Sequence, residues 1–96
     1  MSCALVISLA LVIGACGTAP PVQEMSDARQ AIAVAKEAGA EQIAAEHLRA
    51  AEAFLDSAQR SLSERAYAQA RRDALQAKTR ALDALAAARG ESDGPP

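Results

Sequence analysis

Residues 44–88 read AAEHLRAAEAFLDSAQRSLSERAYAQARRDALQAKTRALDALAAA and contain no glycine or proline. Within them, apolar residues recur at alternating intervals of four and three, which places them on one face of an α-helix. The first series alternates alanine with leucine and consists of Ala44, Leu48, Ala51, Leu55, Ala58 and Leu62. The second is an alanine ladder and consists of Tyr67, Ala70, Ala74, Ala77, Ala81, Ala84 and Ala88, with Leu75, Leu82 and Leu85 beside it. Because alanine is small, the ladder allows another helix to approach closely.

The two series are out of phase, because the step from Leu62 to Tyr67 is five residues. We therefore predict a turn across residues 61–65. A hairpin covers each apolar series with the other, whereas the alternative, one continuous helix over residues 41–89, leaves both in water unless it finds a partner. Residues 41–62 hold four acids and two bases, and residues 64–89 hold three acids and six bases. Antiparallel neighbours of this composition attract each other weakly.

A shorter helix is predicted before this pair. Ser26 is a candidate N-cap, with Asp27 in the first turn and Gly39 as the stop, which gives a helix over residues 27–38. Its apolar face consists of Ala28, Ala31, Ile32, Ala35 and Ala38. The sequence thus predicts an all-α domain over residues 26–89 with helices at about 27–38, 41–62 and 65–89. We expect a short helical hairpin or a three-helix bundle with alanine-rich, antiparallel, coiled-coil-like packing.

Length and charge limit what the chain can be. Its 96 residues hold at most one small domain, and 12 acidic against 10 basic residues give a net charge of −2, with no general reason to bind nucleic acid. All charged residues lie at or after Glu24. The 51% hydrophobic content is therefore an average over an uncharged apolar segment and a charged helix-forming one.

The uncharged segment contains ALVISLALVI at residues 4–13. This run is shorter than the roughly 20 apolar residues that cross a bilayer, and its length suits the apolar region of a secretory leader. It is followed by Ile13-Gly14-Ala15-Cys16, which resembles the lipobox of bacterial lipoproteins. The resemblance implies a signal peptide over residues 1–15, cleaved before Cys16, whose thiol receives a diacylglyceryl group and whose new amino terminus is acylated.

Three acyl chains would anchor the protein durably in a membrane. Gly17 stands where an aspartate would retain such a lipoprotein in the inner membrane, so the resemblance implies the outer membrane of a Gram-negative bacterium, facing the periplasm. Residues 16–25, with Pro20 and Pro21, are predicted to form a flexible tether, and residues 90–96 a disordered tail. An ordinary secretory leader and a buried apolar helix with an inert cysteine are the alternatives. An upstream start codon would supply the positive charge that residues 1–3 lack.

The helical motifs follow a recognisable order. A-x-x-A-I at residues 28–32 precedes Gly39-Ala40, then L-x-x-A-x-x-x-L-x-x-A-x-x-x-L at residues 48–62, then Tyr67-x-x-Ala70 and the alanine ladder. Over residues 16–89 this order resembles a family of short proteobacterial envelope lipoproteins built on a helical domain of unknown function, which also occurs ahead of OmpA-like modules. The family implies no activity and no catalytic residues. Ser63-Glu64-Arg65 stand where the family usually has glycine or aspartate before the tyrosine.

Candidate sites for chemistry are few. His47, the single histidine, has no cysteine or second histidine at ligand spacing, so we predict no metal site, no cofactor and no catalytic residue. The one basic cluster consists of Arg71, Arg72, Lys78 and Arg80. It is interpreted either as the electrostatic partner of the acidic second helix or as a contact for anionic lipid or cell-wall carboxylates. No aromatic residues are interleaved with it for stacking on bases.

Together these features predict a non-enzymatic, lipid-anchored cell-envelope protein. The lipid on Cys16 would anchor the protein in the membrane. The helical faces would offer alanine ridges to a protein partner or to a second copy of the chain. The helical domain would then serve as an interaction or spacer module. The alternative function is a cell-wall or anionic-ligand binding module, with peptidoglycan as a possible partner of the basic third helix.

Overall fold

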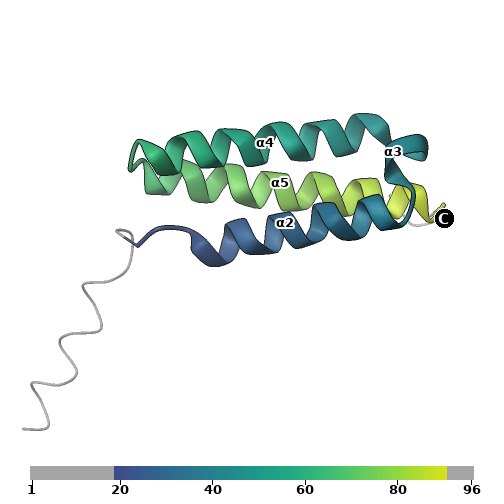
Figure 1. The fold of residues 1–96 in the computed structure, drawn as a ribbon, viewed down its shortest axis with the longest axis horizontal. Coiled ribbons are helices and arrows are strands. Elements are labelled where there is room, and N and C mark those ends of the chain that lie inside the picture. The colour runs from purple at the N-terminus through teal and green to yellow at the C-terminus, as the bar shows by residue number, and fades with distance from the viewer. Residues whose placement is uncertain (1–18, 91–96) are drawn as a thin grey trace, which may run out of the picture.

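The computed structural model describes residues 19–90, which form an all-α bundle. In chain order the helices are α2 (Val22–Glu37), α3 (Ala40–Ile43), α4 (Ala45–Ser63) and α5 (Tyr67–Ala88). α4 and α5 form an antiparallel hairpin, and α2 packs along α5 with a smaller contact to α4 (Figure 1). The predicted hairpin is confirmed, and the alternative of one continuous helix is wrong.

The core lies where α5 meets both neighbours. The alanine ladder is the most buried surface of the molecule, since five of its members have no solvent exposure: Ala70, Ala74, Ala77, Ala81 and Ala84. From α4, the buried members of the predicted series are Leu48, Ala51 and Ala58, with Ala44 just before the helix. Small side chains on facing helices allow a short distance between the axes, and alanine also has the highest helix propensity. The alanines thus both form α5 and bring its neighbours close.

The turn between α4 and α5 follows the Schellman pattern of helix ends. The Arg65 N–H donates to the Leu62 carbonyl at 3.0 Å, and the Ala66 N–H donates to the Ser61 carbonyl at 2.8 Å. Arg65 adopts a φ of 61°, in the left-handed region that favours glycine. The predicted turn at 61–65 therefore lies slightly later, because residues 61–63 still belong to α4 and α5 begins at Tyr67 rather than at residue 65.

The start of α2 corrects two predictions. The helix begins at Val22, directly after Pro21, and Ser26 is an exposed residue inside it rather than its N-cap. Residues 22–25 are consequently helical and not part of a flexible tether. Proline is well tolerated before a first helical turn, where its missing N–H is not needed. Burial of Pro21 and Met25 favours this earlier start, because Met25 packs against Ala58 and Ala74 in the core.

The end of α2 is where the sequence placed it. Gly39 has a φ of 90° and follows the last helical residue, Glu37, by two positions. The predicted second helix over residues 41–62, however, is divided into α3 and α4 by Ala44, whose φ of −134° and ψ of 44° are not helical. This bend lets both Ala40 and Ala44 enter the core, while Ile43 between them is 63% exposed.

Candidate functional site

The predicted lipidation site lies outside the described part of the chain. Cys16 and the lipobox residues Ile13, Gly14 and Ala15 fall within residues 1–18, and most of the predicted tail falls within residues 91–96. Over residues 19–90, no helix combines the length and the hydrophobicity that crossing a membrane requires.

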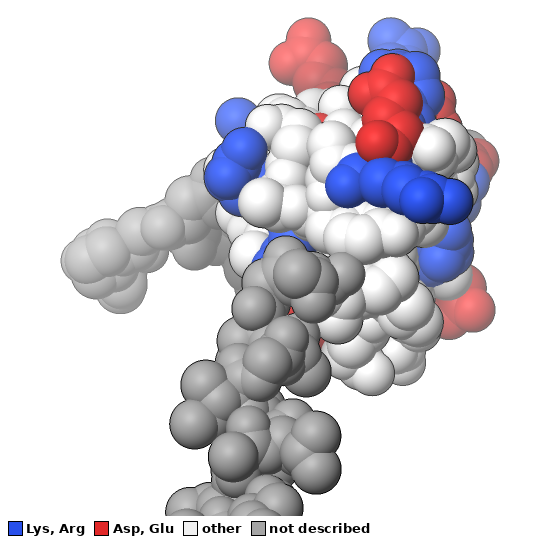
Figure 2. Space-filling view, turned by 90° about the vertical axis from the view of Figure 1, so that its left-hand side faces the viewer, with Lys and Arg blue, Asp and Glu red and all other residues white. Residues whose placement is uncertain are grey.

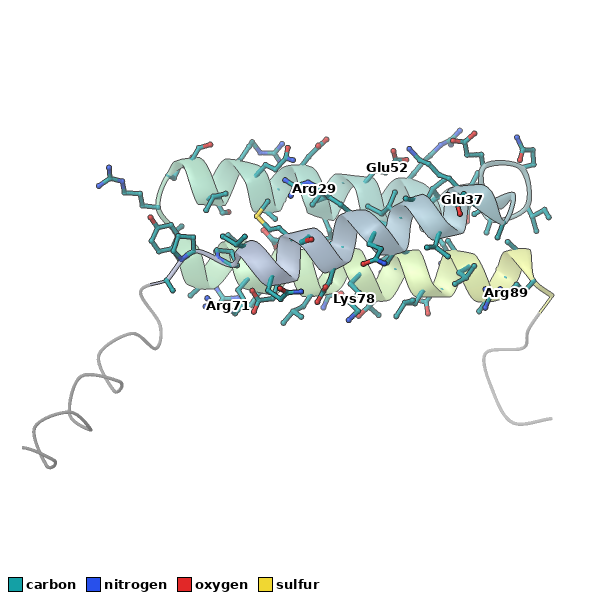
Figure 3. All side chains as sticks on the ribbon, turned by 60° about the horizontal axis from the view of Figure 1, so that its bottom comes forward. Arg29, Glu37, Glu52, Arg71, Lys78 and Arg89 are labelled. Carbon is teal, nitrogen blue, oxygen red and sulfur yellow. The ribbon has the colours of Figure 1, made fainter. Side chains whose placement is uncertain are left out.

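The four residues of the predicted basic cluster do not form one patch. Arg71 and Lys78 are seven residues apart and lie along the edge of α5 that faces α2 (Figure 3). Arg80 lies nine residues from Arg71, which at 100° per residue is about 180° around the helix. Arg72 is exposed and donates from Nη2 to Gln69 Oε1 at 2.7 Å. Helical phase thus divides the basic run between opposite sides of α5.

Arg71 has a defined role within the bundle. Its Nη2 donates to the Ala19 carbonyl at 3.0 Å, and its Nε lies 3.5 Å from Glu24 Oε2. Both charged side chains are 30% exposed. The guanidinium therefore joins the first turns of α5 to the chain that enters α2, where Pro21 is already buried. The sequence offered either the acidic second helix or an external anion as the partner of Arg71, and neither interpretation included this contact.

Electrostatic pairing between α4 and α5 was expected and is not what joins them. Over residues 19–90 the ion pairs are Arg71 with Glu24 and Lys36 Nζ with Glu52 Oε2 at 3.3 Å, and each connects α2 to a neighbour. The polar link between α4 and α5 is instead the Ser57 hydroxyl, which donates to Asp73 Oδ2 at 2.7 Å.

Among residues 19–90, Asp73 is the one acidic residue of the core, and the sequence did not single it out. It is only 7% exposed, and its second oxygen accepts a hydrogen bond from Gln69 Nε2 at 2.9 Å. Its hydrogen-bonding capacity is thus used inside the bundle, as burial of a carboxylate requires. The periodicity offered a weak indication, because Asp73 adjoins Ala74 of the ladder.

Two open grooves flank α2. The groove between α2 and α5 is lined by Asp27, Gln30, Ala31, Val34, Lys78, Leu82 and Leu85. The groove between α2 and α4 is lined by Arg29, Ile32, Ala33, Lys36, Glu52, Leu55 and Asp56.

The apolar surface available to a partner differs from the prediction. The alanine ridges are covered within the bundle by α2 and α4, so they are not free for another molecule. The exposed large apolar residues of the described chain are Val22, Ile43, Leu75 and Leu82. Leu75 and Leu82, seven residues apart, follow the same edge of α5 as Arg71 and Lys78.

His47 lies at the junction of α3 and α4 and is half-buried beside the exposed Glu46. In the part of the chain that the structure describes, no group of three histidine, cysteine, aspartate or glutamate side chains is arranged to hold a metal ion.

No family model, no curated protein and no solved structure matches the chain. The resemblance to envelope lipoproteins therefore rests on the order of motifs in the sequence. The described residues themselves define a small all-α bundle in which Arg71 fixes the chain at its point of entry.

Proposed function

We propose that the chain is a lipid-anchored envelope protein whose bundle serves as a non-enzymatic interaction or spacer module. The observation that carries the proposal is Ile13-Gly14-Ala15-Cys16 directly after an uncharged apolar run. Small residues before the cysteine suit an extended substrate of a signal peptidase, and the thiol is the nucleophile that accepts the lipid. Gly17 after the cysteine favours the outer membrane, with the bundle in the periplasm.

The bundle supports a role in contact rather than in chemistry. Its core consists mainly of alanines with a few larger apolar residues, and the buried Asp73 and Ser61 leave no unsatisfied side-chain atom among the described residues. The two grooves beside α2 are open at the surface, whereas a small-molecule site usually encloses most of its ligand. Exposed Leu75 and Leu82 provide an apolar edge of the kind that interaction modules use.

The test is the intact mass of the protein extracted from the membranes of its native host, beside a Cys16→Ser variant. For the wild-type protein we expect the mass of residues 16–96 plus the acyl groups. The Cys16→Ser variant should not give this mass. Cys3→Ser is the matched control and should leave the mature mass unchanged, because residue 3 belongs to the cleaved leader. An unmodified full-length mass would remove the anchor and contradict the proposal.

A further inference from the structure

Arg71 sets an upper limit on how far the bundle can stand from a lipid on Cys16. The first described residue, Ala19, is held by the Arg71 guanidinium at 3.0 Å, and only Gly17 and Thr18 lie between it and Cys16. Three residues of fully extended chain span at most about 11 Å. A free tether over residues 16–25 would have spanned about 35 Å. Most of this reduction comes from the earlier start of α2, which leaves about 18 Å of chain between Cys16 and the buried Pro21, and the Arg71 contact shortens this span to about 11 Å.

The end of the bundle nearest to that anchor is its basic end. Ala19 and the start of α2 lie at the same end as the turn between α4 and α5 (Figure 1). In the hairpin tip, which we define as residues 60–72, the charged residues are Arg60, Glu64, Arg65, Arg71 and Arg72. Seen end-on, basic side chains lie on several sides of this end of the bundle, with acidic side chains among them (Figure 2). At the opposite end, residues 36–49 together with residues 83–90 hold four acids and three bases.

We infer that the hairpin tip is a contact surface for anionic phospholipid, and that Arg60, Arg65 and Arg72 face the headgroup phosphates while the bundle points away from the membrane. This inference rests on the proposed lipid anchor. All three arginines are exposed, and the one acid of α2 nearest this end, Glu24, is paired with Arg71. Basic residues beside an anionic bilayer are attracted within about one Debye length, roughly 8 Å at physiological salt.

The length of the bundle restricts this attraction to one end. α5 has 22 residues and is therefore about 33 Å long, several Debye lengths. With the entry point of the chain held within about 11 Å of the lipid, the tip stays within about one and a half Debye lengths of the headgroup charge, whereas the α3 end of an upright bundle lies several Debye lengths away. Among anionic ligands, phospholipid is favoured, because the span of about 11 Å is measured from Cys16, the residue that carries the lipid, and so keeps the tip near the bilayer.

The experiment uses the full chain, expressed in a host that processes lipoproteins and reconstituted into vesicles of phosphatidylethanolamine and phosphatidylglycerol. In the processed protein Cys16 is blocked and Cys3 removed, so one introduced cysteine takes a fluorophore. Ser63→Cys labels the tip and Gln42→Cys the far end, and both positions are exposed. We expect a headgroup-linked quencher to quench the label at position 63 severalfold more strongly. Equal quenching at the two positions would overturn the inference.

A pair of charge-matched variants tests the arginines. Arg65→Asn with Arg72→Gln removes two charges from the tip, and asparagine tolerates the left-handed backbone of position 65. Arg49→Gln with Arg89→Gln removes two exposed charges at the other end. In the tip variant, we expect quenching at position 63 to fall and to lose its dependence on phosphatidylglycerol, with no change in the matched control. The same response in both variants would overturn the contact.

A third variant tests the tether itself. Arg71→Met removes both the Ala19 contact and the Glu24 pair, and we expect weaker quenching at position 63 in a protein that still binds vesicles. Unchanged quenching would overturn the role of Arg71. Failure of the lipid anchor is recognised separately, because an unprocessed chain keeps its full-length mass and carries extra label on Cys3 and Cys16.

Discussion

Replacing Arg65 with glycine should stabilise this protein, although it removes a large side chain from a turn. Arg65 is an exposed residue, and its φ of 61° places it in the left-handed region. The other left-handed positions of the described chain are Gly39 and Gly90, each just beyond the end of a helix. Three helices are thus followed by a residue in the left-handed conformation. After α2 and α5 this residue is glycine, whereas after α4 it is Arg65, for which the conformation is strained.

The magnitude follows from two opposing effects. A left-handed backbone costs an ordinary L-residue about 1–2 kcal/mol, which glycine avoids. Glycine increases the entropy of the unfolded chain and so lowers the free energy of unfolding by about 0.5–1 kcal/mol. The net expectation for Arg65→Gly is a gain of about 0.5–1 kcal/mol, or about 2–8 °C in Tm for a domain of this size.

The assay is urea unfolding of wild type and variant, followed by far-ultraviolet circular dichroism. Gly39→Ala is the matched control, since it places a Cβ at a φ of 90° where the nearest neighbour, Ile43 Cδ1, is 3.9 Å away. Because that space is free, the backbone strain of about 1–2 kcal/mol is offset only by the lower entropy of the unfolded chain, and the free energy of unfolding should fall by about 0.5–1 kcal/mol. The two variants are expected to differ in sign.

The reasoning is refuted if Arg65→Gly leaves the unfolding midpoint unchanged or lowers it at constant m-value. Such a result would mean that the turn does not hold position 65 in the left-handed conformation, so the Schellman hydrogen bonds to Ser61 and Leu62 would not describe it.

Three further predictions concern the core. Leu48→Ala should lower the free energy of unfolding by about 2–5 kcal/mol, because Leu48 is 3% exposed, and a loss below 1 kcal/mol in urea would contradict its burial. Ala77→Leu should lower it by about 1–3 kcal/mol, because a ladder position with no exposure has no room for the added carbons, and an unchanged thermal midpoint would oppose this. A double-mutant cycle of Ser57→Ala and Asp73→Ala should give a coupling of about 0.5–3 kcal/mol, and additive losses would mean that their 2.7 Å hydrogen bond is not formed.

The helices of the hairpin were predictable because their burial follows the period of the sequence. Leu48 and Ala77 occupy the positions that the spacing of four and three assigns to the core, and both are buried. Gly39 was also predictable as a stop, since only glycine adopts its backbone without strain. These features depend on residues close together in the chain.

The start of α2 could not be predicted from local capping rules. Ser26 satisfied those rules, but the helix extends to Val22 because Met25 gains a buried position beside α4 and α5. That gain depends on residues more than 30 positions later, Ala58 and Ala74. The turn at Arg65 was displaced for a related reason, because closing the hairpin imposed a left-handed backbone on a residue that does not favour it.

The basic cluster was only partly predictable. The sequence predicts that Arg71 and Arg80 lie on opposite sides of α5, because nine residues at 100° each correspond to about half a turn beyond two full turns. The partner of Arg71 could not be predicted, because it is the backbone carbonyl of Ala19, 52 residues earlier, and every residue has such a carbonyl whatever its side chain. Backbone carbonyls as acceptors are the general reason why sequence patterns miss such contacts.

The contact at the chain's entry and the alanine ladder depend on each other. Arg71 reaches Ala19 and Glu24 only because α2 lies close against α5, and the fully buried Ala74, one turn along from Arg71, packs against Met25 of α2. A larger residue at position 74 would move α2 away from α5 and out of reach of the guanidinium. The position of the first residue that the bundle holds, Ala19, and with it the number of residues between that contact and Cys16, therefore depends on the size of the side chains in the core.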